Sequence, residues 1–290
     1  MRITDSQRFA TTLRHINTNS TALARAVDRA ATGLRHARFS DDPAGNSKVM
    51  TIDSNLRALT QYQRTIDGAR GALAGEETVL QQVTDLLSRA KELASSQGGS
   101  NANAATRQAT AAEVRALREQ AISLGNLQIG GEFIFGGLAT GTPPFLPDGS
   151  YVGTTGSRLH AIAPGQVVPI VHTGGELLVD SGVLGALQSL ETALLNNDAA
   201  GVLAAIAPID GAFDQVQTRL AEVGAGDRRL ELASEVHRNR SDSLKAERAD
   251  LAEIPIDEAS LDLAAAQGAL ESSFLATTRI LSLNLVDFLR

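Results

Sequence analysis

The chain has 290 residues, a formal net charge of −7, 43% hydrophobic residues and only 3% aromatic residues, with neither Trp nor Cys. The missing cysteine excludes disulfides, thiolate metal sites and a cysteine nucleophile, and the acidic balance argues against nucleic acid, which binds clustered Lys and Arg. Apolar content dominated by Ala, Leu and Val rather than aromatic residues favours long helical bundles over a thick globular core.

The first predicted element is a helix from about Thr4 to His36, in which apolar residues recur at steps of four and three, the spacing of a coiled-coil seam. Its polar opening, Met1 to Arg8, lacks the apolar core of a secretory signal, so we expect no export by a cleaved signal peptide. Ser20 falls on a seam position, where it either fixes the helix register or marks a loose turn. The apolar seam consists of Phe9, Leu13, Ile16, Leu23, Val27 and Leu34.

A joint follows at Asp42 and Pro43, where an N-cap residue precedes a proline in the first helical position. The next apolar pattern, from Val49 to Leu93, predicts one long helix although it contains Gly71 and Gly75, each of which costs about 1 kcal/mol relative to Ala. A turn rich in Ser, Gly and Asn and a third predicted helix come next.

The composition changes between Leu138 and Gly182, which hold five of the eight prolines and short β-branched runs, so we predict a small β-rich inserted module there. Helical periodicity resumes at Val183 and continues to Leu251, and Pro255 is predicted to start the final helix. That helix again has coiled-coil spacing. Its seam and the apolar residues beyond it include Ile256, Leu263, Leu270, Phe274, Leu281, Leu285 and Phe288.

These elements predict a mainly α fold, with long terminal coiled-coil helices, a helical-bundle rod and the β-rich inserted module. We expect a terminal domain of residues 1–38 with 254–290, a rod of 39–137 with 183–253, and the module at 138–182. Neither terminal helix can bury its seam alone, so we expect the two helices to pack against each other and against neighbouring copies. The apolar residues named above for the two helices are the predicted subunit interface. The middle seams can instead form the core of a monomeric bundle.

No catalytic, metal-binding or cofactor-binding pattern emerges, and we expect no enzyme activity. The five histidines are scattered without a metal-ligand spacing, which favours solvated or structural roles. His160 and His172 could approach Asp148 or Asp180, but no nucleophile motif supports a triad. The Glu76–Glu77 pair is expected on a solvated helix face. No uninterrupted apolar run approaches the roughly 18 residues that cross a bilayer, so we expect no membrane partner.

Several short runs resemble the bacterial flagellin superfamily, and the resemblance that they carry extends over about residues 1–137 and 206–290. They are Met1–Thr4, Ser40–Pro43, Gly131–Gly137, Arg219–Leu232, Ala269–Phe274 and Ser282–Leu289. Within the superfamily, these runs resemble proteins of the hook-filament junction more than the main filament flagellin.

The resemblance implies that the terminal helices form a coiled coil in the innermost layer of a tube, while the inserted module points outward. It also implies an extracellular structural subunit of the flagellum that is exported unfolded through the flagellar type III channel. The implied partners are other copies of the chain, hook-associated protein 1, flagellin and a flagellar export chaperone. Main filament flagellin, and a surface binding module on a helical stalk, stay open as alternative functions.

Overall fold

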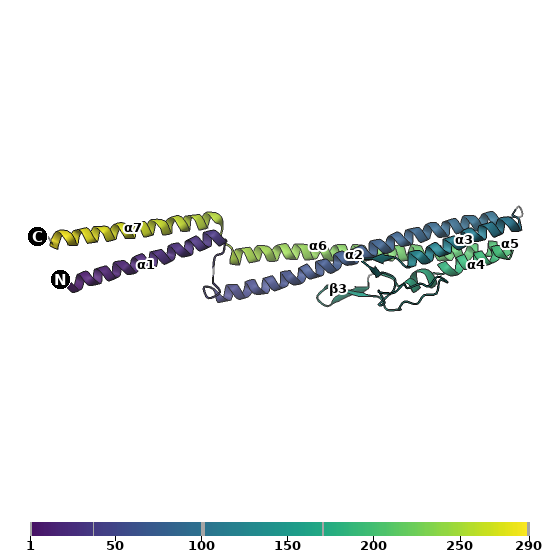
Figure 1. Ribbon diagram of the computed structural model, residues 1–290, viewed down its shortest axis with the longest axis horizontal. Helices are drawn as coiled ribbons and strands as arrows, with labels where there is room; N and C mark the ends of the chain where they lie inside the picture. The colour runs from purple at the N-terminus through teal and green to yellow at the C-terminus, as the bar shows by residue number, and fades with distance from the viewer. Residues whose placement is uncertain (1, 37, 100–101, 170, 289–290) are drawn as a thin grey trace. The chain divides into compact units, whose positions relative to one another are not determined.

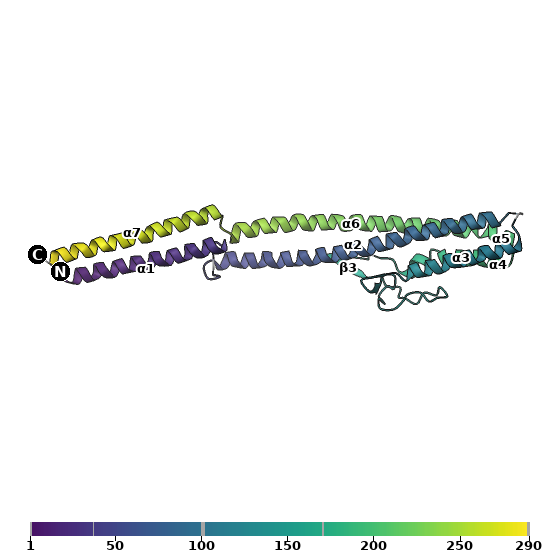
Figure 2. The ribbon, with the colours of Figure 1, turned by 45° about the horizontal axis from the view of Figure 1, so that its top comes forward.

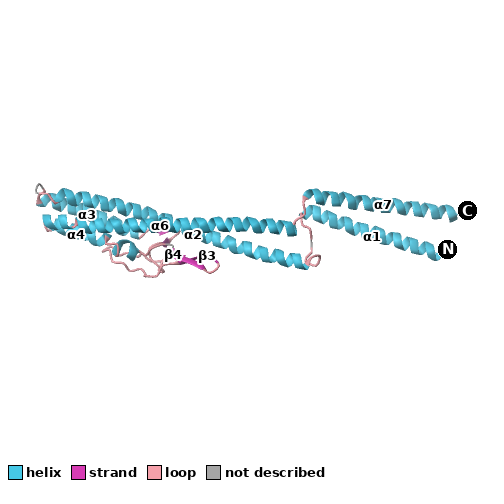
Figure 3. Ribbon diagram, turned by 180° about the vertical axis from the view of Figure 1, so that it is seen from behind, coloured by secondary structure: helices cyan, strands magenta, loops and turns pink. Residues whose placement is uncertain are grey.

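The computed structural model describes residues 2–36, 38–99, 102–169 and 171–288, with side chains described outside 2–6, 8 and 280–288. The chain divides into two compact units, one of Met1–Ala58 with Asn239–Arg290 and one of Leu59–Arg238. Helices dominate both units and the described strands are short, as Figure 3 shows. The mainly α fold predicted from composition and periodicity is therefore confirmed.

In the first unit, α1 (Arg2–Thr32) and α7 (Ile256–Phe288) lie side by side and run in opposite directions (Figures 1 and 2). The helix α1 ends where Gly33 adopts a φ of 68°, a left-handed conformation that residues with a Cβ rarely take. The N–H of Gly33 donates to the carbonyl of Arg29 at 2.8 Å and closes the last turn. The helix therefore stops before the predicted end at His36.

A β-bridge ties the exit of α1 to the segment that leads into α7. Leu34 pairs with Glu253 in this isolated antiparallel bridge, and the N–H of Ile254 donates to the carbonyl of Gly33 at 2.9 Å. Because these are backbone contacts, the side chains at the bridge do not determine whether it forms. The bridge fixes the two terminal helices to each other at the ends that face away from the chain termini.

The two predicted proline starts are both present. The Oδ1 atom of Asp42 accepts the N–H of Gly45 at 2.9 Å, so Asp42 caps the helix that begins at Pro43, as predicted. The carbonyl of Pro255 accepts the N–H of Ala259 at 2.9 Å, which places Pro255 immediately before the first residue of α7. Local capping signals therefore set both helix boundaries.

The second unit is a helical bundle with a small module inserted between two of its helices. Its longest helix crosses Gly71 and Gly75 without a break, which confirms the single helix predicted there. The bundle contains residues of α2 (Pro43–Gln97), α3 (Ala104–Gly125), α4 (Val183–Leu195), α5 (Ala199–Ala204) and α6 (Ile206–Ala252).

Within this unit α2 and α6 run antiparallel, held together by an apolar seam and by polar pairs along its edges. The large buried residues of the bundle include Ile66, Leu80, Leu87, Val114, Leu187, Leu190, Ile209 and Val216. The polar pairs join Gln63 to Ser234, Arg70 to Asp227 and Lys91 to Asp210, at 2.9, 2.8 and 2.6 Å.

The strands form two separate antiparallel hairpins, β1 (Gln128–Ile129) with β2 (Glu132–Phe133) and β3 (Leu159–Ala163) with β4 (Gln166–Pro169). Gly130 and Gly131 form the first turn, and both have positive φ, as a two-residue type I′ turn requires. The second hairpin and a π-helix, η1 (Gly175–Val179), are the regular elements described within the predicted β-rich module. Most of that module is turns and loops.

One aromatic side chain anchors the module to the end of α3. Phe145 is buried, and its backbone exchanges two hydrogen bonds with the amide side chain of Asn126, at 2.9 and 3.0 Å. The ring of Phe145 lies so close to Gly125 and Gly174 that a Cβ on either glycine would come within about 2.6 Å of a ring carbon. The tilted ring of Tyr151 packs against Phe145 with centroids 5.3 Å apart.

One stretch of the described chain, within Ala199–Ala252, has the length and mean hydropathy, 1.2 over 18 residues, of a weak membrane-span candidate. Its Ile209 and Val216 are buried in the bundle core, and the carboxylates of Asp210 and Asp214 interrupt its apolar run.

Candidate functional site

The paired terminal helices bury only a narrow strip of side chains between them. Ala26 on α1 and Ala259 on α7 are almost fully buried, and they lie near the bridged end of this strip. Five predicted seam residues are only partly covered. These half-buried residues are Ile16, Leu23, Leu34, Leu263 and Leu270.

Other predicted interface residues stay exposed in the single chain. Ile256 is 83% exposed and Phe274 is 50% exposed, although both are apolar. Two exposed residues of α7, Leu261 and Leu275, were not predicted, because they fall outside the chosen heptad positions. The remaining exposed seam residues are Phe9, Leu13 and Val27.

The side chains of Leu281, Leu285 and Phe288 lie outside the described part of the structure, although α7 itself continues to Phe288. The contribution of these three residues to a subunit interface stays a prediction.

A polar contact crosses the strip at Asn19. Its Nδ2 atom lies 2.5 Å from Oγ of Ser273 and 3.2 Å from the carbonyl oxygen of Ala269. The predicted polar seam residue, Ser20, is exposed instead. A polar residue does therefore make a contact between α1 and α7, but it is Asn19, the neighbour of the one predicted.

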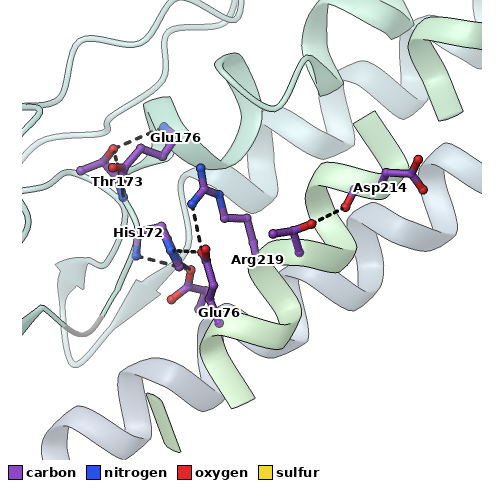
Figure 4. A network of polar contacts seen from close by, with 8 residues as sticks. Glu76, His172, Thr173, Glu176, Asp214 and Arg219 are labelled. Atoms are coloured by element: carbon purple, nitrogen blue, oxygen red, sulfur yellow. Dashed lines mark hydrogen bonds and ion pairs between the residues drawn. The ribbon is translucent and has the colours of Figure 1, made fainter. Parts of the chain in front are cut away.

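The second unit holds a buried charged cluster around His172 (Figure 4). Nδ1 of His172 lies 2.6 Å from Oε1 of Glu76, and Nε2 lies 3.0 Å from Oε2 of Glu222. Arg219 also donates to Oε2 of Glu222, at 2.9 Å. Because both ring nitrogens face carboxylate oxygens, the two contacts form together when either the imidazole or the carboxyl group of Glu76 carries an extra proton.

One prediction about these residues was wrong, and the structure gives no support to a triad that had been considered from the sequence and set aside. The side chain of Glu76 is 0% exposed, whereas the sequence suggested a solvated face. Sequence spacing missed this burial because the covering residue, His172, comes from a distant loop that follows β4. The partners of His172 are Glu76 and Glu222 rather than Asp148 or Asp180, so the triad geometry considered from the sequence is not present.

The protonation of this cluster follows from its contacts. Burial raises the pKa of Glu76, and the hydrogen bond from His172 partly opposes that effect. The hydrogen bond to Glu76 raises the pKa of His172 against the opposite effect of burial. Arg219 lowers the pKa of Glu222. The two raised values describe one shared proton, which we place on His172 because Nε2 then also donates to ionised Glu222.

The cluster has a structural role in this geometry. It joins the loop after β4 to α2 through Glu76 and to α6 through Glu222. The second carboxylate oxygen of Glu76, Oε2, has no hydrogen-bond partner among the described residues. A second histidine, His237, lies against the carbonyl oxygen of Ile162 at 2.5 Å and stacks on Tyr62. Across the described ranges, no group of His, Asp and Glu has the arrangement of a metal site.

Two family models match the chain. The bacterial flagellin N-terminal helical region matches residues 4–140, and the bacterial flagellin C-terminal helical region matches residues 206–289. The chain belongs to the bacterial flagellin family. The matched ranges contain both terminal helices and the long helices of the bundle, whereas residues 141–205 lie between them. Members of this family are structural proteins, so the chain is a structural protein and not an enzyme.

Individual relatives separate two branches of the family. The chain is 24% identical to flagellar hook-associated protein 3 of Escherichia coli (strain K12) over 312 residues, which cover 98% of each chain. It is 32% identical to flagellin of the same strain, but over 82 residues that cover 28% of this chain and 16% of the flagellin. The structure is similar to that of FlgL from Bacillus cereus, with a TM-score of 0.60 and 25% identity over 69% of this chain and 99% of that chain.

Proposed function

We propose that this chain is the subunit that joins the flagellar hook to the filament, as a protein of the hook-associated protein 3 type. It assembles with other copies through its terminal helices, and it contacts hook-associated protein 1 on one side and flagellin on the other. Similarity along nearly the whole of hook-associated protein 3 supports this branch, because the similarity to flagellin is confined to about a quarter of the chain. Main filament flagellin is the alternative within the family.

The observation that carries the proposal is the apolar surface left on the paired terminal helices. Fully burying one Leu, Ile or Phe side chain contributes about 1.5–3 kcal/mol, so each half-exposed residue of α1 or α7 can gain roughly 1 kcal/mol from a neighbour. Joining two proteins costs about 4–15 kcal/mol in lost freedom of motion. A single contact through a few such residues therefore binds weakly, and stable assembly requires that each copy touch several neighbours at once.

The same proposal assigns roles to the three predicted parts. Residues 1–38 with 254–290 supply the contacts between copies, residues 39–137 with 183–253 form the rod, and residues 138–182 form the outward module. The chain acts outside the cell, after unfolded export through the flagellar channel with the help of an export chaperone. The resemblance to the flagellin superfamily supports these roles.

The decisive experiment replaces an exposed apolar residue of α7 with a charge. Phe274→Asp is compared with Leu195→Asp, because Leu195 is also 50% exposed but lies at the end of α4 in the bundle. Each variant replaces the chromosomal copy in the source bacterium, and its incorporation is followed by labelling of purified flagella and by swimming motility. A charge buried without a partner is strongly unfavourable, so Phe274→Asp should be exported but not incorporated.

Leu195→Asp should be incorporated at the level of the unchanged protein. Normal incorporation of Phe274→Asp would remove the terminal helices from the proposed assembly surface. Labelling along the whole filament, rather than at one place near its base, would favour the filament flagellin alternative.

A further inference from the structure

A basic pocket lies at the C-terminal end of α1. It has a volume of about 560 Å³ and is formed by the last turns of α1 and by the segment that follows this helix. Its cationic side chains outnumber its two carboxylates, Asp28 and Asp41. The cationic lining residues are Arg25, Arg29, Arg35, His36 and Arg38.

The arginines of this pocket are short of acceptors. Arg29 pairs through Nη1 with Asp262 of α7 at 3.0 Å, but its buried Nε has no hydrogen-bond partner in the described structure. Within the same described ranges, the guanidinium groups of Arg25, Arg35 and Arg38 have no ion pair. Guanidinium groups bind carboxylates strongly and with defined geometry, so the pocket fits an acidic surface.

A matching acidic face lies on the first turn of α7. Asp257 and Glu258 are exposed, and they are the acidic residues that begin this helix. Ala259 is almost fully buried, and at 100° per residue Asp257 lies on the outward side of α7, opposite Ala259, while Glu258 lies on its flank. Leu261, which is also exposed, lies on the same outward side.

The basic pocket and the acidic face lie at the same end of the first unit. The bridge between Leu34 and Glu253 holds the exit of α1 beside the start of α7 and so sets this common level. Within the described residues no ion pair joins the two surfaces, so both are available to a neighbouring copy. Such a pair forms a heterologous contact between copies, which produces a ring or a helical array.

We infer that the basic pocket of one copy binds the Asp257–Glu258 face of the next copy, side by side around the assembly. This inference rests on the proposed assembly function and assigns it a second interface, made of charges rather than of apolar residues. The contact between the basic pocket and the Asp257–Glu258 face would select the register between copies. A neighbour that is shifted along its axis or turned end for end would place like charges against one another, which is unfavourable.

Charge reversal tests the inference without removing any buried group. One variant carries Arg25→Glu and Arg38→Glu, a second carries Asp257→Arg and Glu258→Arg, and a third combines all four changes. Each is expressed in place of the normal chain, and its incorporation into purified flagella is measured by labelling. The melting temperatures of the purified variants show whether each one folds.

Each two-residue variant should be incorporated at least tenfold less than the unchanged chain, and the combined variant should recover at least half of normal incorporation. Failure of the combined variant to recover while it remains folded would overturn the inference, as would normal incorporation of either two-residue variant. Saturable binding of inorganic phosphate to the pocket, with assembly unaffected by charge reversal, would identify a small-anion site instead and would also overturn it.

The outcome is independent of the apolar interface. If Phe274→Asp abolishes incorporation and charge reversal does not, the proposed function stands and only the charged contact fails. If Phe274→Asp is incorporated normally, the assembly role of the terminal helices fails whatever the charge variants do.

Discussion

Replacing His172 by Ala should destabilise the second unit by leaving a buried carboxylate without its cation. The contact between Nδ1 of His172 and Oε1 of Glu76 is 2.6 Å long, and the Glu76 side chain is fully buried. Removing one partner of a buried ion pair costs about 3–5 kcal/mol. Because burial already raises the pKa of Glu76, that group can take up a proton instead, so we expect a cost near the lower end, about 3 kcal/mol.

The assay is thermal unfolding of the full chain at pH 6, followed by circular dichroism and calorimetry. A loss of about 3 kcal/mol corresponds to a fall in Tm of roughly 6–12 °C for a unit of this size. His160→Ala is the matched control, because His160 lies in the same module and its side chain has no hydrogen bond or ion pair within the described residues. We expect that control to lower the unfolding free energy by less than about 1 kcal/mol.

A second substitution identifies the cause. In the His172→Ala background, Glu76→Gln removes the buried charge, so it should recover at least about 1 kcal/mol if the lost stability comes from the unpaired carboxylate. The reasoning is refuted if His172→Ala unfolds within 2 °C of the unchanged chain. It is also refuted if Glu76→Gln lowers the stability of the His172→Ala variant further.

Three further predictions concern pH, a helix end and the helix register. The stability that His172 contributes should be complete below its unfolded pKa of about 6.5 and should disappear as pH rises through its raised folded pKa. In urea unfolding, the difference in unfolding free energy between the unchanged chain and His172→Ala should therefore narrow from pH 6 to pH 9. Gly33→Ala should lower the unfolding free energy by about 1–2 kcal/mol, because φ is positive there. No other atom lies near enough to clash, so backbone strain is the whole of this cost. A melting curve identical to that of the unchanged chain would contradict this. Asn19→Ala should cost about 1 kcal/mol and speed amide exchange in α1 and α7, since its contact with Ser273 is lost; unchanged exchange would show that Asn19 does not define the register.

Local signals in the sequence were sufficient for most helix boundaries. The Asp42–Pro43 start follows from capping chemistry that involves only adjacent residues, and it is present as predicted. The end of α1 was placed too late, because the sequence pattern was extended past Gly33, whose left-handed conformation is itself a local signal for the end of a helix.

The candidate site was predicted only in part, for two physical reasons. The inward residues are Asn19 and Ala26 rather than Ser20 and Val27. From Ile16 either choice gives alternating steps of three and four, so coiled-coil spacing alone does not distinguish them. The burial of Glu76 depends on a loop that no periodicity in α2 could reveal. Whether the exposed apolar residues of α1 and α7 contact neighbouring copies stays a prediction.

From the bridge at Leu34 we also expect one order of folding in the first unit. More than two hundred residues separate α1 from α7, and closing so long a loop from an unfolded chain loses conformational entropy before any contact compensates for it. Once Leu34 meets Glu253, only a short loop separates each further pair of residues, so α1 and α7 can zip together one turn at a time from the bridge toward the termini. Pairing of the ends is then the final and most readily reversed step, and a chain that loses it can restore it without unfolding elsewhere.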